Sequence, residues 1–291
     1  MKNSDFYKEK GIYENLRTSK DINDFTITKQ LGKGSSGFVR NAIHNQTQKK
    51  VIIKYVVKSL ILRGCWTYSN DNAYKKFPNE IAVLQNLYDK FNGDVPNNLT
   101  KLIAYWEDSI YYYLVFADTE DFNSDLFDYI DKTTDKMMSE KEAKIIFKNI
   151  VEAIQTLHHN HIVHRDIKDE NVLINYQTKE IQLIDFGSST FYKKDQKLSN
   201  FVGSFLFAAP EIVKGMTYEG PPQDIWSLGI LLYTMIYKAI PFNDYYEIIR
   251  KKMTFPQSIS NECKELIIWM TNRDSSKRPT IDQVLNHSWL N

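Results

Sequence analysis

The chain has 291 residues, of which 42% are hydrophobic, which suffices for one large domain or for two lobes that share a cleft. Its 37 Lys and Arg nearly balance its 36 Asp and Glu, so no overall charge draws the protein onto nucleic acid or an anionic membrane. The only cysteines, Cys65 and Cys263, are too few for a disulfide framework and fit no zinc-ligand spacing, so we expect free thiols in a reducing compartment.

The N-terminal part of the sequence predicts no targeting segment. Residues 1–24 are polar and lack the apolar run of a secretory signal, so we expect a polar N-terminal tail. The longest apolar run, residues 226–240, contains Lys238 and is shorter than the roughly 20 residues that a membrane-spanning helix needs. We therefore expect a buried core helix there, and a monomeric protein in the cytoplasm or nucleus.

The predicted elements change character along the chain. Residues 25–57 alternate between apolar and polar positions and contain many β-branched residues, which predicts an antiparallel meander of strands. A helix is then predicted over residues 79–91, before further strands. Beyond Leu126 helical periodicity dominates, with long helices expected over residues 140–160, 224–237 and 261–272. The pattern predicts an α+β fold with a small strand-rich lobe, a larger helical lobe and a ligand cleft between them.

A glycine-rich segment, LGKGSSGFV at residues 31–39, has the pattern GxGxxGxV. Because glycine has no side chain, backbone amides at Gly32, Gly34 and Gly37 can approach phosphate oxygens closely. A plain glycine-rich hairpin is the alternative, since the motif alone is a weak signal. Dinucleotide-binding folds use the same glycines before a helix, but here strand-like residues follow, which argues against that fold.

Two charged residues follow at positions where they can act on a nucleotide. Lys54 ends the next strand-like run, where its ammonium group can reach the α and β phosphates. Glu80 lies in the first predicted helix and can pair with Lys54. Taken alone, each of them is most simply an ordinary surface charge, so only their order along the chain supports the functional interpretation.

The segment HRDIKDEN, residues 164–171, supplies acids, cations and an amide together. Asp166 can accept a proton from a hydroxyl group, and Lys168 can offset charge on a transferred phosphate. Asn171, and Asp185 fourteen residues later in DFG, offer oxygen ligands of the kind that magnesium prefers. These residues predict a site for phosphoryl transfer.

In this order, the glycine loop, strand lysine, helix glutamate, HRD, DFG and APE resemble a eukaryotic protein kinase from about residue 25 to the C-terminus. The resemblance implies a kinase domain over residues 25–291, with a small lobe at 25–116, a hinge at 117–120 and a large lobe at 121–291. It implies ATP and Mg²⁺ as cofactors, Asp166, Lys168, Lys54 and Glu80 as catalytic residues, and Asn171 and Asp185 as metal ligands. The implied nucleotide-binding residues are Leu31, Gly32, Lys33, Gly34, Gly37, Val39, Ile52, Lys54, Phe116, Ala117, Thr119 and Leu173.

Further matches to the family imply structural and specificity roles. Glu211 of APE is expected to form a buried bidentate ion pair with Arg278, and Asp224 to anchor the catalytic loop from a core helix. Lys168, two residues after Asp166, is typical of serine/threonine kinases. The segment GSFLFAAPE resembles the same class, with Ser204 as a peptide-positioning residue and Phe207 where tyrosine is usual.

The segments GCWTY, DLFDYID and TYEGPPQDIWSLGILLYT are similar to PAS-domain-regulated kinases, and PIM kinases share much of this pattern. Both belong in or near the calmodulin-dependent kinase group. The chain is short for an added PAS sensor, so we expect the sensor to be absent. Ile52 replaces the usual alanine beside adenine, so we expect a tighter nucleotide pocket and a weaker affinity for ATP. Phe116 matches the gatekeeper position.

Substrate choice is predicted from charge. Asp125, Asp128, Asp169 and Glu170 match positions where related kinases bind arginines N-terminal to the target residue. Alternatively, Asp125 caps the helix that begins at Leu126, and Asp128 is simply solvated.

The predictions about regulation and about alternative functions depend on fewer residues. Arg165 can bind a phosphate on Ser199, but we expect activity without this modification, as in the similar kinases. A pseudokinase that serves as a scaffold, and a kinase that acts on small molecules, are the alternative functions.

Overall fold

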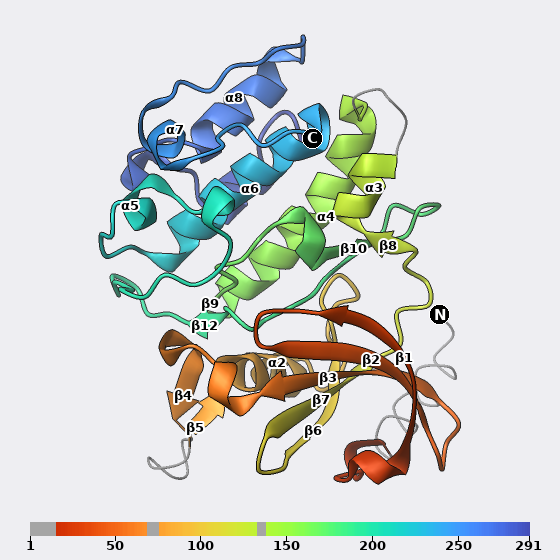
Figure 1. Cartoon of the computed structure of the whole chain (residues 1–291). Helices are drawn as coiled ribbons and strands as arrows, with labels where there is room; N and C mark the ends of the chain where they lie inside the picture. Colours follow the sequence, from red (N-terminus) through yellow and green to blue (C-terminus); the bar gives the residue numbers. More distant parts are fainter. Residues whose placement is uncertain (1–15, 69–75, 133–137) are drawn as a thin grey trace. The chain divides into compact units, whose positions relative to one another are not determined.

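The computed structural model describes residues 16–68, 76–132 and 138–291, and these residues form two compact units (Figure 1). The first unit ends at Val95 and resumes over Thr100–Glu120, whereas the second contains Pro96–Leu99 and Asp121–Asn291. The chain therefore passes into the second unit just after the expected hinge. The segment Pro96–Leu99, which we expected in the small lobe, belongs to the second unit, where the backbone amide of Leu183 donates to the carbonyl of Asn98 at 2.9 Å.

The first unit is built on a five-stranded sheet with the strand order β1-β2-β3-β7-β6, in which every neighbouring pair is antiparallel. Helix α2 packs against β6, and a short β4–β5 hairpin precedes α2. The central strand β3 is largely buried because it carries apolar side chains on both of its faces. These elements are β1 (Phe25–Lys33), β2 (Gly37–His44), β3 (Lys50–Val57), β4 (Trp66–Tyr68), β5 (Lys76–Pro78), α2 (Asn79–Lys90), β6 (Leu102–Glu107) and β7 (Tyr111–Ala117).

The folded part of the first unit begins earlier than the sequence predicted. Leu16 is only 1% exposed and packs in a core cluster with Phe25 and Val115. Ser19 is also buried and hydrogen-bonds His44 at 2.9 Å. The predicted polar tail over residues 1–24 is therefore wrong for its described part from Leu16 onward, because Leu16 lies in the core cluster and Ile22 packs against it. Residues 1–15 lie outside the described residues.

The second unit is mainly helical, with α6 at its centre (Figure 1). Its helices are α3 (Leu126–Lys132), α4 (Glu140–His159), α5 (Pro210–Val213), α6 (Gly220–Tyr237), α7 (Tyr245–Arg250), α8 (Asn261–Met270) and α9 (Ile281–Leu285). Its short strands are β8 (Ser124–Asp125), β9 (Ile162–Val163), β10 (Val172–Ile174), β11 (Ile181–Leu183) and β12 (Thr190–Phe191). Its short 3-10 helices are η4 (Asp169–Asn171), η5 (Phe205–Phe207) and η6 (Ser275–Lys277), whereas η1 (Ile22–Asp24), η2 (Lys58–Leu60) and η3 (Arg63–Cys65) belong to the first unit.

Helix α6 is the core helix that the apolar run predicted. Nearly all its residues are buried, including Trp226 and Leu231 with no exposed surface, because an apolar sequence on every side demands neighbours all round. Within the described ranges, no helix is both long and apolar enough to cross a membrane. The α+β architecture that the sequence predicted is confirmed.

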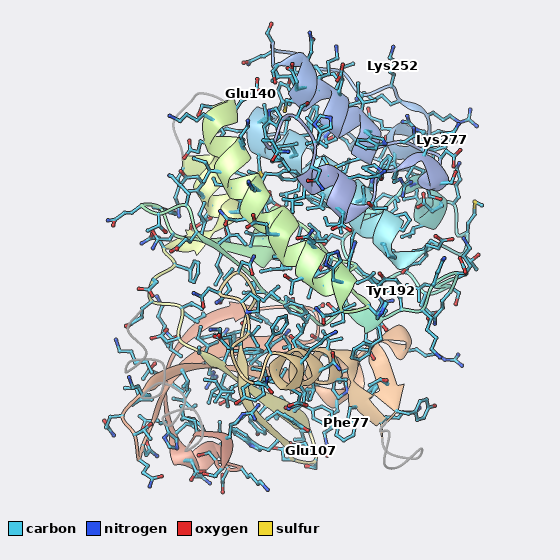
Figure 2. The ribbon with its side chains drawn as sticks, turned by 180° about the vertical axis from the view of Figure 1, so that it is seen from behind. Phe77, Glu107, Glu140, Tyr192, Lys252 and Lys277 are labelled. Carbon is cyan, nitrogen blue, oxygen red and sulfur yellow. The ribbon has the colours of Figure 1, made fainter. Side chains whose placement is uncertain are left out.

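Helix α4 has one apolar face, which packs against α6 and α9. Ser139 caps its N-terminus by accepting a hydrogen bond from the backbone amide of Glu142. Glu140, in the first turn, accepts hydrogen bonds from the Ser260 amide at 2.7 Å and from the Trp289 indole at 2.9 Å (Figure 2). At the opposite end of α4, the Tyr192 hydroxyl donates to the carbonyl of His158 at 3.1 Å. The N-terminal end of α4 is thus held by Ser260 and Trp289, and its C-terminal end by Tyr192.

Candidate active site

The glycine-rich segment forms the hairpin between β1 and β2. The Gly34 amide donates to the Gly37 carbonyl at 2.8 Å. A side chain at Gly37 would place its Cβ only 1.7 Å from the carbonyl oxygen of Tyr55 on β3, whereas Cβ atoms at Gly32 and Gly34 would meet nothing within 4 Å. Gly37 is therefore required by the close approach of β2 and β3. Gly32 and Gly34 have no such steric requirement, so their predicted role at the phosphates stays a prediction.

Lys54 and Glu80 form the predicted ion pair. The lysine Nζ lies 2.6 and 2.9 Å from the two carboxylate oxygens, and the side chains are 12% and 4% exposed. Strand β3 presents Lys54 opposite Val39 of β2 and Leu114 of β7. Glu80 lies in the first turn of α2, where the helix dipole favours a carboxylate. The pair positions an ammonium group on the central strand.

The predicted adenine-contacting residues of the first unit lie around the same part of the sheet. Ile52 pairs in register with Phe116 on β7, and each side chain is 8% exposed. Ile52 and Lys54 point to the same face of β3 because side chains alternate along a strand. Leu31 and Lys33 are exposed on β1, and Ala117 and Thr119 are partly buried. Leu173, on β10, belongs to the second unit.

The carboxylate of Asp166 is held by bonds to both of its oxygens. The backbone amide of Ser204 donates to Oδ1 at 2.8 Å, and the side-chain nitrogen of Asn171 donates to Oδ2 at 3.1 Å. The same Asn171 nitrogen also donates to the Asp166 carbonyl at 2.8 Å. The catalytic loop (residues 164–171) and the activation segment (residues 185–211, from DFG to APE) therefore fix the orientation of the carboxylate together.

Asp224 anchors the catalytic loop as the sequence predicted. Its side chain has no exposed surface, and it accepts hydrogen bonds from the backbone amides of His164 at 2.9 Å and Arg165 at 2.8 Å. His158 of α4 lies 2.9 Å from the same carboxylate. Arg165 has a φ of 66°, a left-handed conformation that these contacts stabilise against its intrinsic cost.

The two predicted metal ligands lie at the same end of the β10–β11 hairpin. The amide of Ile184 donates to the Asn171 carbonyl at 2.9 Å, which brings the following residue, Asp185, beside Asn171. Asp185 is exposed, with a φ of 60°. Because Asp166 engages the side-chain nitrogen of Asn171, the amide oxygen is the atom that can bind a cation.

This ligand set fits magnesium better than a transition metal. Magnesium prefers hard oxygen ligands and needs only one or two from the protein, because water and phosphate supply the rest. Among the described residues, no group of three or more His, Cys, Asp or Glu is placed to hold a metal ion. Lys168 lies 3.5 Å from Glu170, so its ammonium group stays within the catalytic loop.

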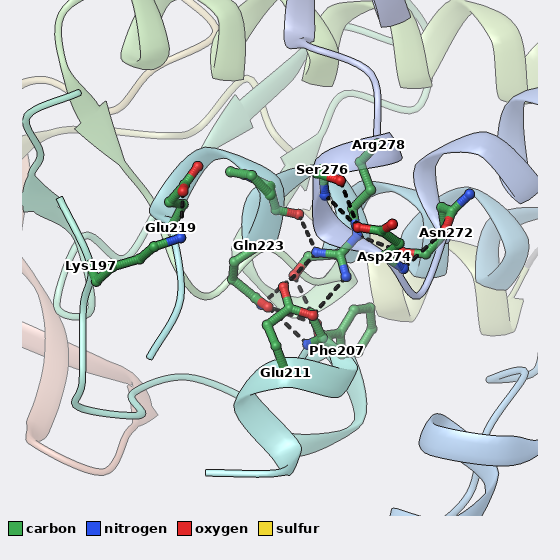
Figure 3. Close-up of polar contacts among 12 residues, drawn as sticks. Lys197, Phe207, Glu211, Glu219, Gln223, Asn272, Asp274, Ser276 and Arg278 are labelled. Carbon is green, nitrogen blue, oxygen red and sulfur yellow. Dashed lines mark hydrogen bonds and ion pairs between the residues drawn. The ribbon is translucent and has the colours of Figure 1, made fainter. Parts of the chain in front are cut away.

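Glu211 and Arg278 form the predicted bidentate ion pair (Figure 3). Both N–O distances are 2.7 Å, and the Arg278 side chain has no exposed surface. Its remaining donors reach the carbonyls of Asn272 at 2.8 Å and Pro222 at 2.9 Å. Four of the five N–H donors of the guanidinium thus have acceptors, and the side chain ties the APE segment to the C-terminal residues.

Sequence reasoning missed the residues that shape the segment before APE. Gln223, which is 3% exposed, accepts a hydrogen bond from the Ala209 amide at 2.8 Å and donates to the Phe207 carbonyl at 3.2 Å. Ser227 donates to the same carbonyl at 2.8 Å. Gly203 has a φ of +101°, and a Cβ there would lie 2.4 Å from the Arg165 carbonyl. The only available signal was the position of Gln223 beside Asp224.

The acids proposed for arginine recognition divide into two groups. Asp125 caps α3 by accepting the Asp128 amide at 2.8 Å, and Asp128 pairs with Lys132 at 2.5 Å. A pocket of about 470 Å³ in the second unit instead has Asp131, Asp169 and Glu170 as the acids in its lining. It is lined by Phe127, Ile130, Asp131, Lys168, Asp169, Glu170, Ser204, Phe205, Leu206, Phe207, Thr234, Lys238, Ala239 and Ile240.

Asp169 has an unusual environment in this pocket. It is 5% exposed, and burial, followed by the neighbouring charge of Glu170, raises the pKa of its carboxyl to about 6. The capping alternative that we considered for Asp125 is confirmed. Asp131, which was not predicted, is the acid of α3 that lines this pocket.

The regulatory candidates lie on the activation segment and beneath it. Ser199 is exposed, and the flanking Leu198 pairs with Tyr218 as an isolated bridge. Arg165 is only 4% exposed, and its Nε donates to the Ser188 carbonyl at 2.5 Å. Arg165 therefore holds the start of the activation segment, and a phosphate on Ser199 would have to compete with this bond.

Residues 25–290 match the family model described as the protein kinase domain, so the chain belongs to the protein kinase family. The serine/threonine-protein kinase PSK2 of Saccharomyces cerevisiae is 41% identical over 276 residues, which cover 93% of this chain and 24% of PSK2. The serine/threonine-protein kinase pim-2 of Danio rerio is 34% identical over 268 residues, which cover 91% of this chain and 84% of pim-2. The chain thus spans about a quarter of the length of PSK2. The predicted kinase resemblance, with PAS-type and PIM-type relatives, is confirmed.

Proposed function

We propose that this chain is a serine/threonine protein kinase that transfers the γ-phosphate of ATP to hydroxyl groups of proteins. The observation that carries the proposal is the fixed carboxylate of Asp166, bonded on one oxygen by Ser204 and on the other by Asn171. A base held this way is oriented before the substrate arrives, which lowers the entropic cost of reaching the transition state. The names of the relatives PSK2 and pim-2 support the same activity.

In the proposed mechanism, Asp166 orients the substrate hydroxyl and accepts its proton. Lys54, held by Glu80, binds the α and β phosphates, and Lys168 offsets charge on the transferred group. When bound through the oxygens of Asn171 and Asp185, magnesium would neutralise charge on the phosphates. Most of the acceleration comes from positioning and charge stabilisation, with the base adding about 10²–10⁴-fold.

The proposed substrates carry basic residues N-terminal to the phosphorylated serine or threonine. Asp131, Asp169 and Glu170 line a pocket that also contains Ser204, whose backbone amide bonds to Asp166. An arginine in this pocket would form charge-assisted hydrogen bonds with the acids, while Phe127 and Ile130 would pack on its aliphatic stem. The monomeric state and the cytoplasmic or nuclear location stay predictions.

Helix α3 offers a matched pair of variants that tests this preference. Asp131→Asn removes an acid that lines the pocket, whereas Asp128→Asn removes an acid of the same helix that pairs with Lys132. On a degenerate serine peptide array with labelled ATP, we expect Asp131→Asn to weaken the preference for arginine about 3- to 10-fold and Asp128→Asn to leave it unchanged. Equal effects of the two variants, or transfer without any arginine preference, would remove this substrate assignment.

A further inference from the structure

The segment that precedes the family match is joined to the helix that carries Glu80. We refer to residues 16–19 as the N-terminal segment, and they lie outside the matched residues 25–290. Leu16 is 1% exposed and packs in the core of the first unit, which fixes the segment on the sheet. The next residue, Arg17, makes two contacts that reach different elements of the unit.

The first contact of Arg17 is with an irregularity in the sheet. The pairing of β6 with β7 passes from Leu102 to Ala104 with a shift in register, so Ile103 is the extra residue of the strand. The Arg17 Nε donates to the Ile103 carbonyl at 3.0 Å. Because a buried carbonyl needs a donor, this bond gives Arg17 a defined position over β6.

The second contact of Arg17 is with α2. Its guanidinium carbon lies 3.3 Å from the centre of the Tyr88 ring, in cation–π geometry. The other end of the Tyr88 ring lies close to the turn after α2, since a Cβ on Gly93 would come within 2.9 Å of the tyrosine hydroxyl. Tyr88 is thus held between Arg17 and the Gly93 turn, with little freedom to move.

Tyr88 and Glu80 belong to the same helix, two turns apart. With a rise of 1.5 Å per residue, the eight residues between them span about 12 Å. An intact helix moves as a rigid body, so a shift of α2 at Tyr88 also displaces Glu80 in the first turn of the helix. Glu80 lies 2.6 Å from Lys54, and a displacement of about 1 Å is enough to lengthen that contact beyond normal hydrogen-bond range.

We propose that Arg17 is a positioning residue that acts through Tyr88 to fix the position of α2, and so keeps Glu80 in contact with Lys54. This inference rests on the proposed function for the role of the Lys54–Glu80 pair in nucleotide binding. The proposal gives a functional role to the N-terminal segment, which precedes the residues that match the kinase family. Arg17 itself has no role in contacting the nucleotide.

The N-terminal segment supplies a matched control. The Ser19 hydroxyl lies 2.9 Å from Nε2 of His44 on β2, and His44 Nδ1 lies 2.8 Å from the Thr47 hydroxyl. Burial lowers the pKa of His44, so its ring is neutral at pH 7. Ser19→Ala therefore loosens the same segment through β2, and its removed contact does not involve α2.

The experiment compares Arg17→Ala, Arg17→Lys and Ser19→Ala in the full chain, with three readouts. These are the melting temperature, kcat/KM for ATP measured well below melting, and hydrogen exchange of the α2 amides. For Arg17→Ala we expect kcat/KM to fall roughly 3- to 20-fold, through KM for ATP, with faster exchange over residues 81–87. Arg17→Lys keeps a cation and a donor and should recover part of the loss. Ser19→Ala should lower the melting temperature without either effect.

Two outcomes would overturn the proposal. One is a loss of kcat/KM in Arg17→Ala no greater than in Ser19→Ala at an equal loss of melting temperature, which indicates a purely structural role. The other is unchanged exchange in α2, which shows that Arg17 does not seat the helix. If the wild-type chain transfers no phosphate, the proposed function fails, while the exchange measurement still decides whether Arg17 positions α2.

Discussion

For a single residue, burial decides how much the loss of an ion-pair partner lowers the free energy of unfolding. The ion pair between Glu211 and Arg278 is an example. The Arg278 side chain has no exposed surface and donates to Glu211 and to two carbonyls. Glu219 and Lys197 form another ion pair nearby, but their side chains are 43% and 54% exposed (Figure 3). Removing one partner of a buried pair leaves the other charge unpaired in a low dielectric, whereas water replaces the partner at the surface.

We predict that Glu211→Gln lowers the free energy of unfolding by about 3–5 kcal/mol. The matched surface variant Glu219→Gln should lower it by less than about 1 kcal/mol. Urea unfolding of the two variants beside the wild type measures both values. Similar losses in the two variants would contradict the assignment of Glu211 as the partner that Arg278 requires.

The carboxyl of Asp169 gives a second prediction at this scale, on pH. Burial raises its pKa from 3.8 to about 6 in the pocket that Asp131, Lys168, Glu170 and Lys238 also line. Between these pH values the folded chain holds a proton that the unfolded chain releases, so the free energy of unfolding falls as the pH rises from about 4 to about 6 and levels off above the folded-state pKa. Asp169→Asn removes this effect. Relative to the wild type, the variant should gain unfolding free energy between about pH 4 and pH 6 and little more above pH 6, as measured by urea titration at each pH. A difference that does not change with pH would contradict the raised pKa.

Among the structural elements, the glycine hairpin contains one glycine that the fold requires, Gly37, and one, Gly34, for which we expect a role in ATP binding. A Cβ on Gly37 would lie 1.7 Å from the Tyr55 carbonyl of β3, whereas a Cβ on Gly34 would meet nothing within 4 Å. We predict that Gly37→Ala lowers the free energy of unfolding by about 1–3 kcal/mol, because β2 and β3 must move apart. Gly34→Ala should change it by less than about 0.5 kcal/mol and raise KM for ATP. Thermal unfolding and steady-state kinetics of both variants test this contrast. An equal loss of stability in the two would show that the hairpin does not distinguish the two positions.

The elements also show what the sequence could predict and why. Helices α2, α4 and α8 were predicted because their apolar periodicity is a local property of the chain, and α6 because its apolar run is equally local. The Lys54–Glu80 and Glu211–Arg278 pairs followed from residues that occur in a recognised order.

The missed features depend on tertiary placement. Leu16 is one apolar side chain in a polar stretch, and only the sheet on which it packs distinguishes it from a tail residue. Asp128 and Asp131 are identical residues three positions apart, and the way in which α3 packs decides which of them lines the pocket. Gln223 likewise has no local signature, because its partners lie on the segment before APE.

At the scale of the whole molecule, the residues assigned to phosphoryl transfer come from both compact units. Lys54 and Glu80 belong to the first, and Asp166, Asn171 and Asp185 belong to the second. We therefore expect activity only from a chain that contains both units intact. A pseudokinase that serves as a scaffold would keep both units folded and perform no transfer, so stability measurements alone do not separate the two functions.

The most direct test of the central claim is transfer of labelled phosphate from ATP and magnesium to a serine peptide array. The wild type is compared with Asp185→Asn, whose removed carboxylate is exposed and should leave the melting temperature nearly unchanged. We predict robust transfer by the wild type that falls at least about 100-fold in the variant. Absence of transfer by a folded wild-type chain, or equal transfer by the folded variant, would contradict it.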